Sequence, residues 1–225
     1  VLAQPSRSSR NILFSGNLGL FTGDTLFDRL ARAVCEAACL PRKELYEAWE
    51  TAKRVRRKMR GGPVVELAAG HGLLAAIMII LDDSTEYATC VDIQQPPSHA
   101  TLLAILEKKW PRLQGRVRFA ESRIEDSEIP PNALLASVHA CGSLTDQVLD
   151  LAIGHQCRVA VLPCCHDLEK CDTGNLLGWM EGPLAVDSTR AARLRNAGFE
   201  VQTAAIPQDI TPKNRLLMGW PKSSS

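Results

Sequence analysis

The chain has 225 residues, of which 45% are hydrophobic and 23% charged, and its formal net charge is +1. This length suffices for one α/β domain with a sizeable core, and the near-neutral charge means that nucleic-acid binding would need a local basic patch. The sequence has no apolar run of about 18 residues, so we expect no membrane span. Residues 1–15 are polar and basic, which predicts that the chain has no signal peptide.

Eight cysteines would be enough for a disulfide framework. Several of them, however, lie inside apolar stretches of a long chain with alternating strand and helix patterns. We therefore expect reduced thiols and an intracellular, reducing compartment, either cytoplasm, nucleus or an organelle.

The first sixty residues read as an arm followed by two helices. Residues 1–23 show little periodicity and predict a loosely docked arm. Helical spacing predicts one helix from Asp24 or Thr25, either of which can cap it, and a second at about 42–59. We expect residues 1–60 to pack on a domain formed by residues 61–225.

From residue 61 on, strand and helix patterns alternate. The predicted strands are 64–67, 87–93, 117–121, 133–139, 158–162, 199–206 and 215–220. The predicted helices are 73–80, 96–115, 143–154 with Ser143 as its cap, and 187–197, the last after a polar loop at 167–183. This alternation predicts an α/β fold with a doubly wound, mostly parallel seven-stranded sheet. The last two strands have no helix between them, so they should form a C-terminal antiparallel hairpin.

The first predicted strand leads into a glycine turn and a buried helix. Gly70 has no Cβ, so it can adopt the backbone conformation of a tight turn without a steric penalty, and Gly72 lets a ligand approach the backbone. The free N–H groups of the helix start would face that ligand, which indicates a nucleotide-type cofactor. The run from Gly70 also fits the dinucleotide pattern G-x-G-x-x-A, with Asp92 22 residues later, so NAD or FAD remains an alternative.

Other features favour a different cofactor. Glu66 lies four residues before Gly70, where an acid can take the amino group of an amino-acid-like ligand. The run from Glu66 to Gly72 resembles the E/D-x-G-x-G-x-G pattern of S-adenosylmethionine-dependent methyltransferases, with Ala68 in place of the first glycine. A closing hairpin also fits that fold, which is Rossmann-like. The resemblance implies these cofactor-binding residues: Glu66, Ala68, Gly70, Gly72, Asp92, Ile93, Arg123, Ile124 and His139. It implies that Asp92 binds the ribose hydroxyls and that Ile93, Arg123 and Ile124 lie beside the adenine.

Two further blocks follow the fourth and fifth predicted strands. They read H-x-C-G-x-x-T-D from His139 and C-C-H from Cys164. They resemble a methyltransferase-domain family that includes the eukaryotic tRNA 2′-O-ribose methyltransferase and several methyltransferase-like proteins. The resemblance covers roughly residues 62–221, and it implies an enzyme that modifies RNA, either tRNA or rRNA.

The chemistry of these blocks has several interpretations. One is a nucleophilic cysteine, and another a metal site formed by Cys164, Cys165, His166 and Cys171, although this spacing is unlike known zinc motifs. A third is small buried residues that pack under the cofactor. We favour the interpretation that the two blocks form the wall of the acceptor pocket and bind no metal. The candidate catalytic residues are Asp146, His166 and Cys165. The candidate substrate-binding residues are Cys141, Cys164 and Lys213.

The end of the second predicted helix is strongly basic. Six of the eight residues at 53–60 are Lys or Arg, too many to be neutralised by internal partners if they surround the helix. We predict that Arg54, Arg56 and Arg57 contact RNA phosphates, the alternative being a solvated helix end favoured by the helix dipole. Other possible functions are methylation of a protein or small molecule, an NAD- or FAD-dependent oxidoreductase, and a non-catalytic interaction module.

Overall fold

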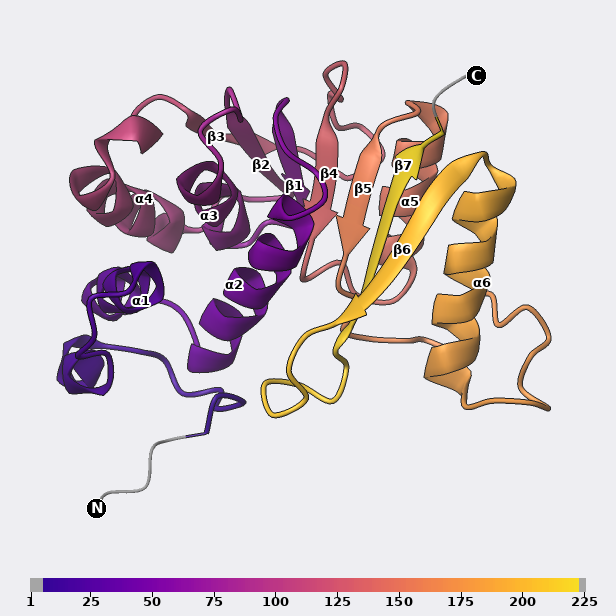
Figure 1. Cartoon of the computed structure of the whole chain (residues 1–225), viewed down its shortest axis with the longest axis horizontal. Coiled ribbons are helices and arrows are strands. Elements are labelled where there is room, and N and C mark those ends of the chain that lie inside the picture. The colour runs from indigo at the N-terminus through magenta and orange to yellow at the C-terminus, as the bar shows by residue number, and fades with distance from the viewer. Residues whose placement is uncertain (1–5, 223–225) are drawn as a thin grey trace.

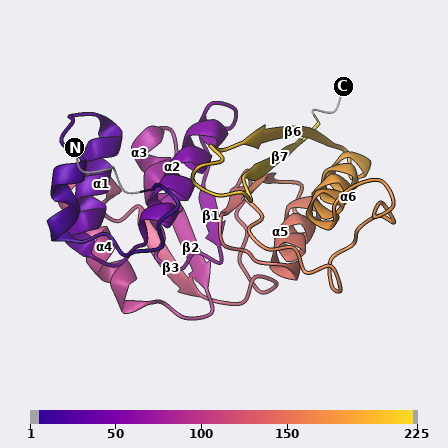
Figure 2. The same cartoon turned by 90° about the horizontal axis from the view of Figure 1, so that it is seen from below.

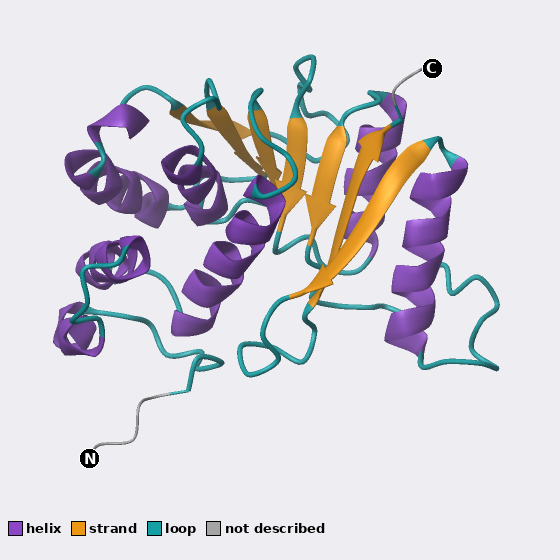
Figure 3. Cartoon of the chain, viewed as in Figure 1, coloured by secondary structure: helices purple, strands orange, loops and turns teal. Residues whose placement is uncertain are grey.

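A computed structural model describes residues 6–222, so the predicted arm at 1–23 begins outside the described residues. One seven-stranded sheet forms the centre of the molecule (Figures 1 and 3). Its strands are β1 Val64–Leu67, β2 Ala88–Asp92, β3 Val117–Glu121, β4 Leu134–Ser137, β5 Arg158–Val161, β6 Phe199–Ala205 and β7 Arg215–Pro221. They lie in the order β3-β2-β1-β4-β5-β7-β6.

The strand directions confirm the predicted fold class. Strands β1 to β5 pair in parallel, whereas β7 pairs antiparallel with both β5 and β6. Strands β6 and β7 therefore form the C-terminal hairpin. The strand order reverses between β1 and β4, and in open α/β sheets this switch point is where a crevice for ligands opens at the carboxyl ends of the strands.

Helices cover both faces of the sheet (Figure 2). In β1, Val64 packs into one apolar cluster and Val65 into the other, because successive side chains of a strand point to opposite faces. The first cluster also contains side chains of α3 (Leu73–Leu81) and α4 (Pro97–Lys109). The second contains side chains of α5 (Ser143–Gly154) and α6 (Gly182–Asn196).

The N-terminal segment packs on the α3 and α4 side. It contains a short 3-10 helix, η1 (Ser15–Leu20), followed by α1 (Leu26–Ala37) and α2 (Arg42–Arg56). A second 3-10 turn, η2 (Pro111–Leu113), follows α4. One apolar cluster includes residues from both sides of position 60, so these helices share the core of the sheet. Among the described residues, no helix has the length and apolarity needed to span a membrane.

Several local predictions need correction. The arm is more ordered than its composition suggested, because Leu13 and Phe21 are buried. Ser143 is the first residue of α5 and does not cap it: the N-cap is Gly142, without a side-chain bond. Helix α6 begins five residues before the predicted start, since Pro183 fits the first turn of a helix, where no N–H is needed.

Candidate cofactor and acceptor site

Three neighbouring cavities lie at the carboxyl edge of the sheet. The central cavity, of about 250 Å³, is bounded by the turn after β1, the end of β4 and the start of α2. The β2-side cavity, of about 310 Å³, shares Ala68 and Asp92 with it. The β5-side cavity, of about 340 Å³, shares Glu44 and His139 with the central one. The three cavities thus adjoin across the switch point of the sheet.

Glu66 forms part of the wall of the central cavity from within β1. Its side chain is buried, and its carboxylate accepts a hydrogen bond from the backbone N–H of Ala75 at 2.7 Å. Burial raises the pKa of this carboxyl to about 8, against the lowering effect of the Ala75 and Leu74 N–H groups. The group is therefore mostly protonated at neutral pH, and a cation in the cavity would favour its charged form.

The turn after β1 holds three residues in the left-handed region: Ala68, Gly70 and Gly72, with φ of 52°, 51° and 75°. Ala68 adopts the conformation that the methyltransferase pattern assigns to a glycine. A Cβ on Gly70 would meet no atom within 4 Å, so this residue leaves space for a ligand. A Cβ on Gly72 would lie 2.7 Å from the sulfur of Cys90 and 2.8 Å from Nδ1 of His99. Gly70 thus serves the turn as predicted and also keeps the cavity open, whereas Gly72, which was predicted to let a ligand approach, lines none of the three cavities and allows α3 to pack closely.

Asp92 lies at the end of β2, between the central and β2-side cavities. Its two carboxylate oxygens accept hydrogen bonds from the N–H groups of Gly70 at 2.9 Å and Ile93 at 2.8 Å. These bonds fix the carboxylate, and its remaining lone pairs can accept from hydroxyl groups. Ile93 is 78% exposed and lines the β2-side cavity together with Arg123 and Ile124. The structure thus brings together the residues that the resemblance assigned to ribose and adenine.

The β5-side cavity is lined by charged side chains that the sequence analysis largely missed. They are the cations Arg10, Lys43 and Lys213 and the acids Glu44 and Glu47. Burial raises the pKa of both carboxyls. Only Lys213 was predicted to contact a substrate. The other four precede residue 60, and no local pattern distinguishes them from ordinary surface charges.

His139 separates the central cavity from the β5-side cavity, and it lines both. Burial lowers its pKa to about 4, and the positive charge of Lys43 acts in the same direction, while Asp92 opposes it. The imidazole is therefore neutral at physiological pH. A neutral imidazole has one nitrogen lone pair, which can accept a hydrogen bond.

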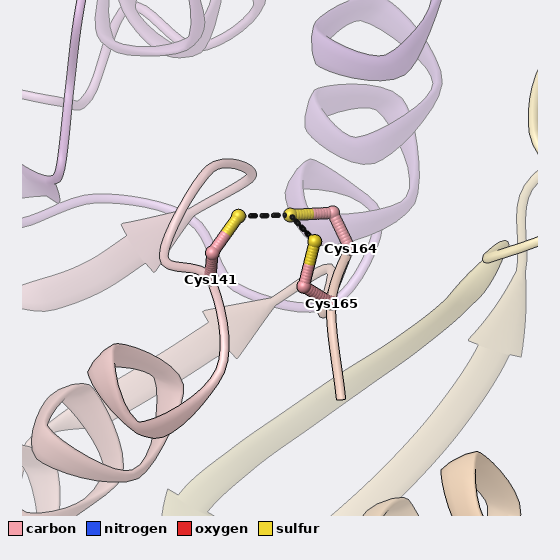
Figure 4. A group of neighbouring side chains, drawn as sticks. All are labelled: Cys141, Cys164 and Cys165. Carbon is pink, nitrogen blue, oxygen red and sulfur yellow. Dashed lines mark hydrogen bonds between the residues drawn. The ribbon is translucent and has the colours of Figure 1, made fainter. Parts of the chain in front are cut away.

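Three thiols meet beside this cavity: Cys141 from the loop after β4, and Cys164 and Cys165 from the loop after β5 (Figure 4). Burial raises the pKa of the Cys165 thiol, but hydrogen bonds from the other two thiols and the charge of Lys213 outweigh it, so the net shift is downward. Cys164 and Cys165 line the β5-side cavity.

Asp146 and His166, which we predicted to be catalytic, lie outside the three cavities. Both carboxylate oxygens of Asp146 accept hydrogen bonds from Arg190, at 2.8 and 2.7 Å. The His166 side chain is only 2% exposed, and its Nε2 lies 2.7 Å from a carboxylate oxygen of Asp187. These contacts join α5 and the loop after β5 to α6. Of the three predicted catalytic residues, only Cys165 reaches a cavity.

The basic end of α2 also differs from the prediction. Arg56 is buried, and it donates to the carbonyl of Met78 at 3.2 Å and to the hydroxyl of Thr85 at 2.7 Å. Lys53 and Arg54 both pair with Glu50. Internal partners therefore exist for half of the six cations.

The remaining three cations of this run, Arg57, Lys58 and Arg60, are exposed. The carbonyl of Arg60 accepts a hydrogen bond from Arg158, the first residue of β5, at 2.6 Å. This contact places the end of the run at the amino edge of the sheet, opposite the cavities. Arg54, Arg56 and Arg57 line none of the three cavities.

Comparison with solved structures supports the fold assignment. An O-methyltransferase family protein from Burkholderia thailandensis gives a TM-score of 0.53 at 16% identity, covering 93% of this chain and 64% of that one. The Bacillus subtilis M1A22 tRNA methyltransferase TrmK gives 0.52 at 10% identity, covering 76% and 65%. Human N-acetylserotonin methyltransferase gives 0.50 at 13% identity, covering 87% and 56%. The chain thus spans less than two thirds of each of these proteins, and at such identities the likeness concerns the fold.

A search of the curated proteins finds no match to this chain. Residues 43–171, more than half of the sequence, match a protein family described as a methyltransferase domain. This segment contains the glycine turn after β1, Asp92 and the thiols of both loops. The chain therefore belongs to this methyltransferase-domain family.

Proposed function

We propose that the chain is an S-adenosylmethionine-dependent methyltransferase that acts on RNA. The methyl donor occupies the central and β2-side cavities, with its amino-acid end near Glu66, its ribose on Asp92 and its adenine beside Ile93. The acceptor enters through the β5-side cavity. The observation that carries the proposal is that the donor cavity adjoins, at Glu44 and His139, a cavity lined by three cations.

When bound, S-adenosylmethionine supplies a methyl group already activated on a sulfonium. The chain then has to align the acceptor with this methyl group and exclude water. His139 lies between the two cavities, and its neutral imidazole can accept a hydrogen bond from the acceptor O–H or N–H and so orient it. Because its pKa is lowered to about 4, the imidazole does not retain the acceptor proton at neutral pH, and the proton leaves to solvent.

The cations of the β5-side cavity support a phosphate-bearing acceptor. Arg10 and Lys213 are exposed, while Lys43 forms an ion pair with Glu47 at 2.9 Å. Contacts of Lys and Arg with phosphates supply most of the affinity in non-specific nucleic-acid binding. A net charge of +1 gives no general attraction to RNA, so local cations next to the donor site are the arrangement that such an acceptor needs. One protein of similar fold is a tRNA methyltransferase by name, and tRNA or rRNA is the substrate that we test first.

The first experiment measures label transfer from methyl-tritiated S-adenosylmethionine into separated RNA, protein and small-molecule fractions of a cell extract. We expect label in RNA and its loss in Gly70→Arg, which fills the turn. Transfer into protein or small molecules alone would contradict the RNA proposal and leave the methyltransferase assignment intact. Transfer retained by Gly70→Arg would overturn the cofactor site.

A pair of double variants locates the RNA-binding surface. Arg10→Gln with Lys213→Gln removes two exposed cations at the β5-side cavity, and Arg57→Gln with Lys58→Gln removes two at the amino edge. Only the first should lower the salt dependence of RNA binding, and the slope should fall by about 0.7 for each phosphate of a single-stranded RNA that is no longer neutralised. Weaker RNA binding by the second variant alone would instead place RNA on the basic end of α2.

An amine acceptor is the second candidate, because Glu44 and Glu47 also line the β5-side cavity. Carboxylates there could hold a cationic amine of a protein or a small molecule. Glu44→Gln would then weaken acceptor binding, whereas an RNA acceptor would bind at least as well to this variant.

We also propose that the chain works in a reducing compartment. All eight cysteines lie in the described part of the chain, and each is a free thiol. Labelling of thiols in cell lysates before and after reduction would test this, and an oxidised cysteine pair in untreated cells would argue against it.

A further inference from the structure

Two loops that are far apart in the sequence bring three sulfur atoms together (Figure 4). The Sγ atoms of Cys141, Cys164 and Cys165 all lie within 4.8 Å of one another. Cys141 and Cys164 are separated by 2.6 Å, and Cys164 and Cys165 by 3.8 Å. Cys141 and Cys165 are exposed, so the cluster is open to solvent.

Adjacent residues of a strand point to opposite faces, and a pair of neighbouring cysteines on a strand could not share one ligand. Here β5 ends at Val161, and residues 162–167 have no regular structure. The alternation of a strand therefore does not apply to Cys164 and Cys165. Cys164 turns its sulfur atom toward Cys141, and the sulfur of Cys165 points toward that of Cys164. The backbone N–H of Gly142, next to Cys141, donates to the carbonyl of Cys165 at 3.2 Å, which ties the two loops together.

We propose that these three thiols bind one thiophilic d10 cation of the zinc class, with a fourth coordination position left open. Zn–S bonds of about 2.3 Å in a tetrahedral site place the sulfur atoms about 3.8 Å apart. The Cys164–Cys165 separation already has this value, and the Cys141–Cys164 pair has to open by about 1 Å, a small movement for two loops. Three protein ligands and an open position are the arrangement of catalytic rather than structural zinc sites.

The surroundings of the cluster favour an incomplete ligand set. Within residues 6–222, no His, Asp, Glu or further Cys joins the three thiols. Two members of the sequence-based candidate set point elsewhere: His166 bonds Asp187, and the sulfur of Cys171 accepts from Arg190 at 3.6 Å. Cys164 and Cys165 line the β5-side cavity, so water or an acceptor group entering this cavity can take the fourth position. The site does not depend on which acceptor the enzyme uses.

The test is a metal titration of the full chain, reduced and freed of metal under anaerobic conditions. Cobalt(II) is added first, because thiolate coordination gives charge-transfer absorption and tetrahedral geometry gives intense d–d bands. Zinc(II) then displaces the cobalt, which yields its affinity and stoichiometry. The variants are Cys141→Ser, Cys164→Ser and Cys165→Ser, and Cys39→Ser is the control, since that partly buried thiol lies outside the cluster. Circular dichroism verifies that each variant is folded.

We expect one ion per chain, and removal of any one of the three ligands should weaken zinc binding by more than about 100-fold. Cys39→Ser should bind as the unaltered chain does. The proposal is overturned if the reduced chain gives no saturable cobalt–thiolate band, or if a cluster variant keeps full affinity. A Cys141–Cys164 disulfide in the chain as isolated, together with no metal uptake after reduction, would also overturn it. None of these readouts depends on methyl transfer, so failure of the RNA proposal leaves this test unaffected.

Discussion

The backbone N–H of Ala75 donates a hydrogen bond to the carboxylate of Glu66, so an acid buried in β1 completes the first turn of α3. The N-cap of that helix, Gly72, has no side chain to do so. The same carboxylate lines the central cavity. One side chain thus serves both the fold and the site, and substitutions have to separate the two roles.

Glu66→Gln separates them, because the amide oxygen can still accept from Ala75 while the charge is removed. We expect the variant to fold and to bind S-adenosylhomocysteine, which keeps the ammonium group, roughly 10- to 100-fold more weakly. Isothermal titration calorimetry measures this affinity, and Glu36→Gln is the control, because Glu36 pairs with Lys109 and lines none of the three cavities. Unchanged affinity would mean that Glu66 acts only on α3.

Glu66 also predicts a pH dependence of stability. Burial raises its pKa from an ordinary value of 4.5 to about 8 in the folded chain. Between these values the unfolded chain loses the proton while the folded chain keeps it, so the contribution of this group is fully present below about pH 4.5 and is lost as pH rises to about 8. In urea unfolding across this pH range, the free energy of unfolding should fall in the unaltered chain and should fall less in Glu66→Gln. Parallel curves for the two proteins would refute the assignment.

Substitution by alanine should have different effects at the two glycines of the turn. Gly72→Ala combines left-handed strain with contacts to Cys90 and His99, and we expect a loss of about 2–5 kcal/mol in the free energy of unfolding. Gly70→Ala has only the strain, about 1–2 kcal/mol, and should mainly weaken cofactor binding. Denaturant unfolding and calorimetry on both variants check this, and equal losses of stability would contradict it.

Ala68 is held at a positive φ that its side chain disfavours. Ala68→Gly removes this strain but adds backbone entropy to the unfolded chain, so we expect a net gain of about 0.5–1 kcal/mol. A thermal unfolding scan measures the change. A lower melting temperature would show that contacts of the methyl group outweigh the strain.

Substitution of Asp146 tests whether the acid of the H-x-C-G-x-x-T-D block is catalytic or structural. Its partner Arg190 is 2% exposed, and Asp146→Asn would remove the closer of the two acids that pair with this buried cation, leaving Asp187 at 3.5 Å. We expect a loss of about 1.5–3 kcal/mol in stability, the contribution of hydrogen bonds to a charged group. The kcat of the folded protein should stay at the level of the unaltered chain, because Asp146 lies outside the three cavities. A large fall in kcat with unchanged stability would restore the catalytic interpretation.

The fold class, and the grouping of the residues that we propose for the methyl donor, were predictable from the sequence by itself. Alternating strand and helix patterns follow from local periodicity, and the turn from Glu66 to Gly72 is contiguous, so both can be read along the chain. Asp92 and Ile93 are predictable for the same reason, because the carboxyl ends of neighbouring parallel strands meet at one edge of the sheet. The packing role of Gly72 was not predictable, since it depends on side chains from β2 and α4.

Only the tertiary structure shows which side chains line the β5-side cavity, the proposed acceptor half of the site. The N-terminal segment contributes Arg10, Lys43 and Glu44 to the lining of the β5-side cavity, and no local sequence pattern predicts this. Burial of Arg56 and pairing of Asp146 depend on partners more than 20 residues away in the sequence. The same holds for the three thiols, which meet only because the loops after β4 and β5 leave parallel neighbouring strands at the same edge. Local patterns specify elements, whereas long-range packing specifies which side chains share a site.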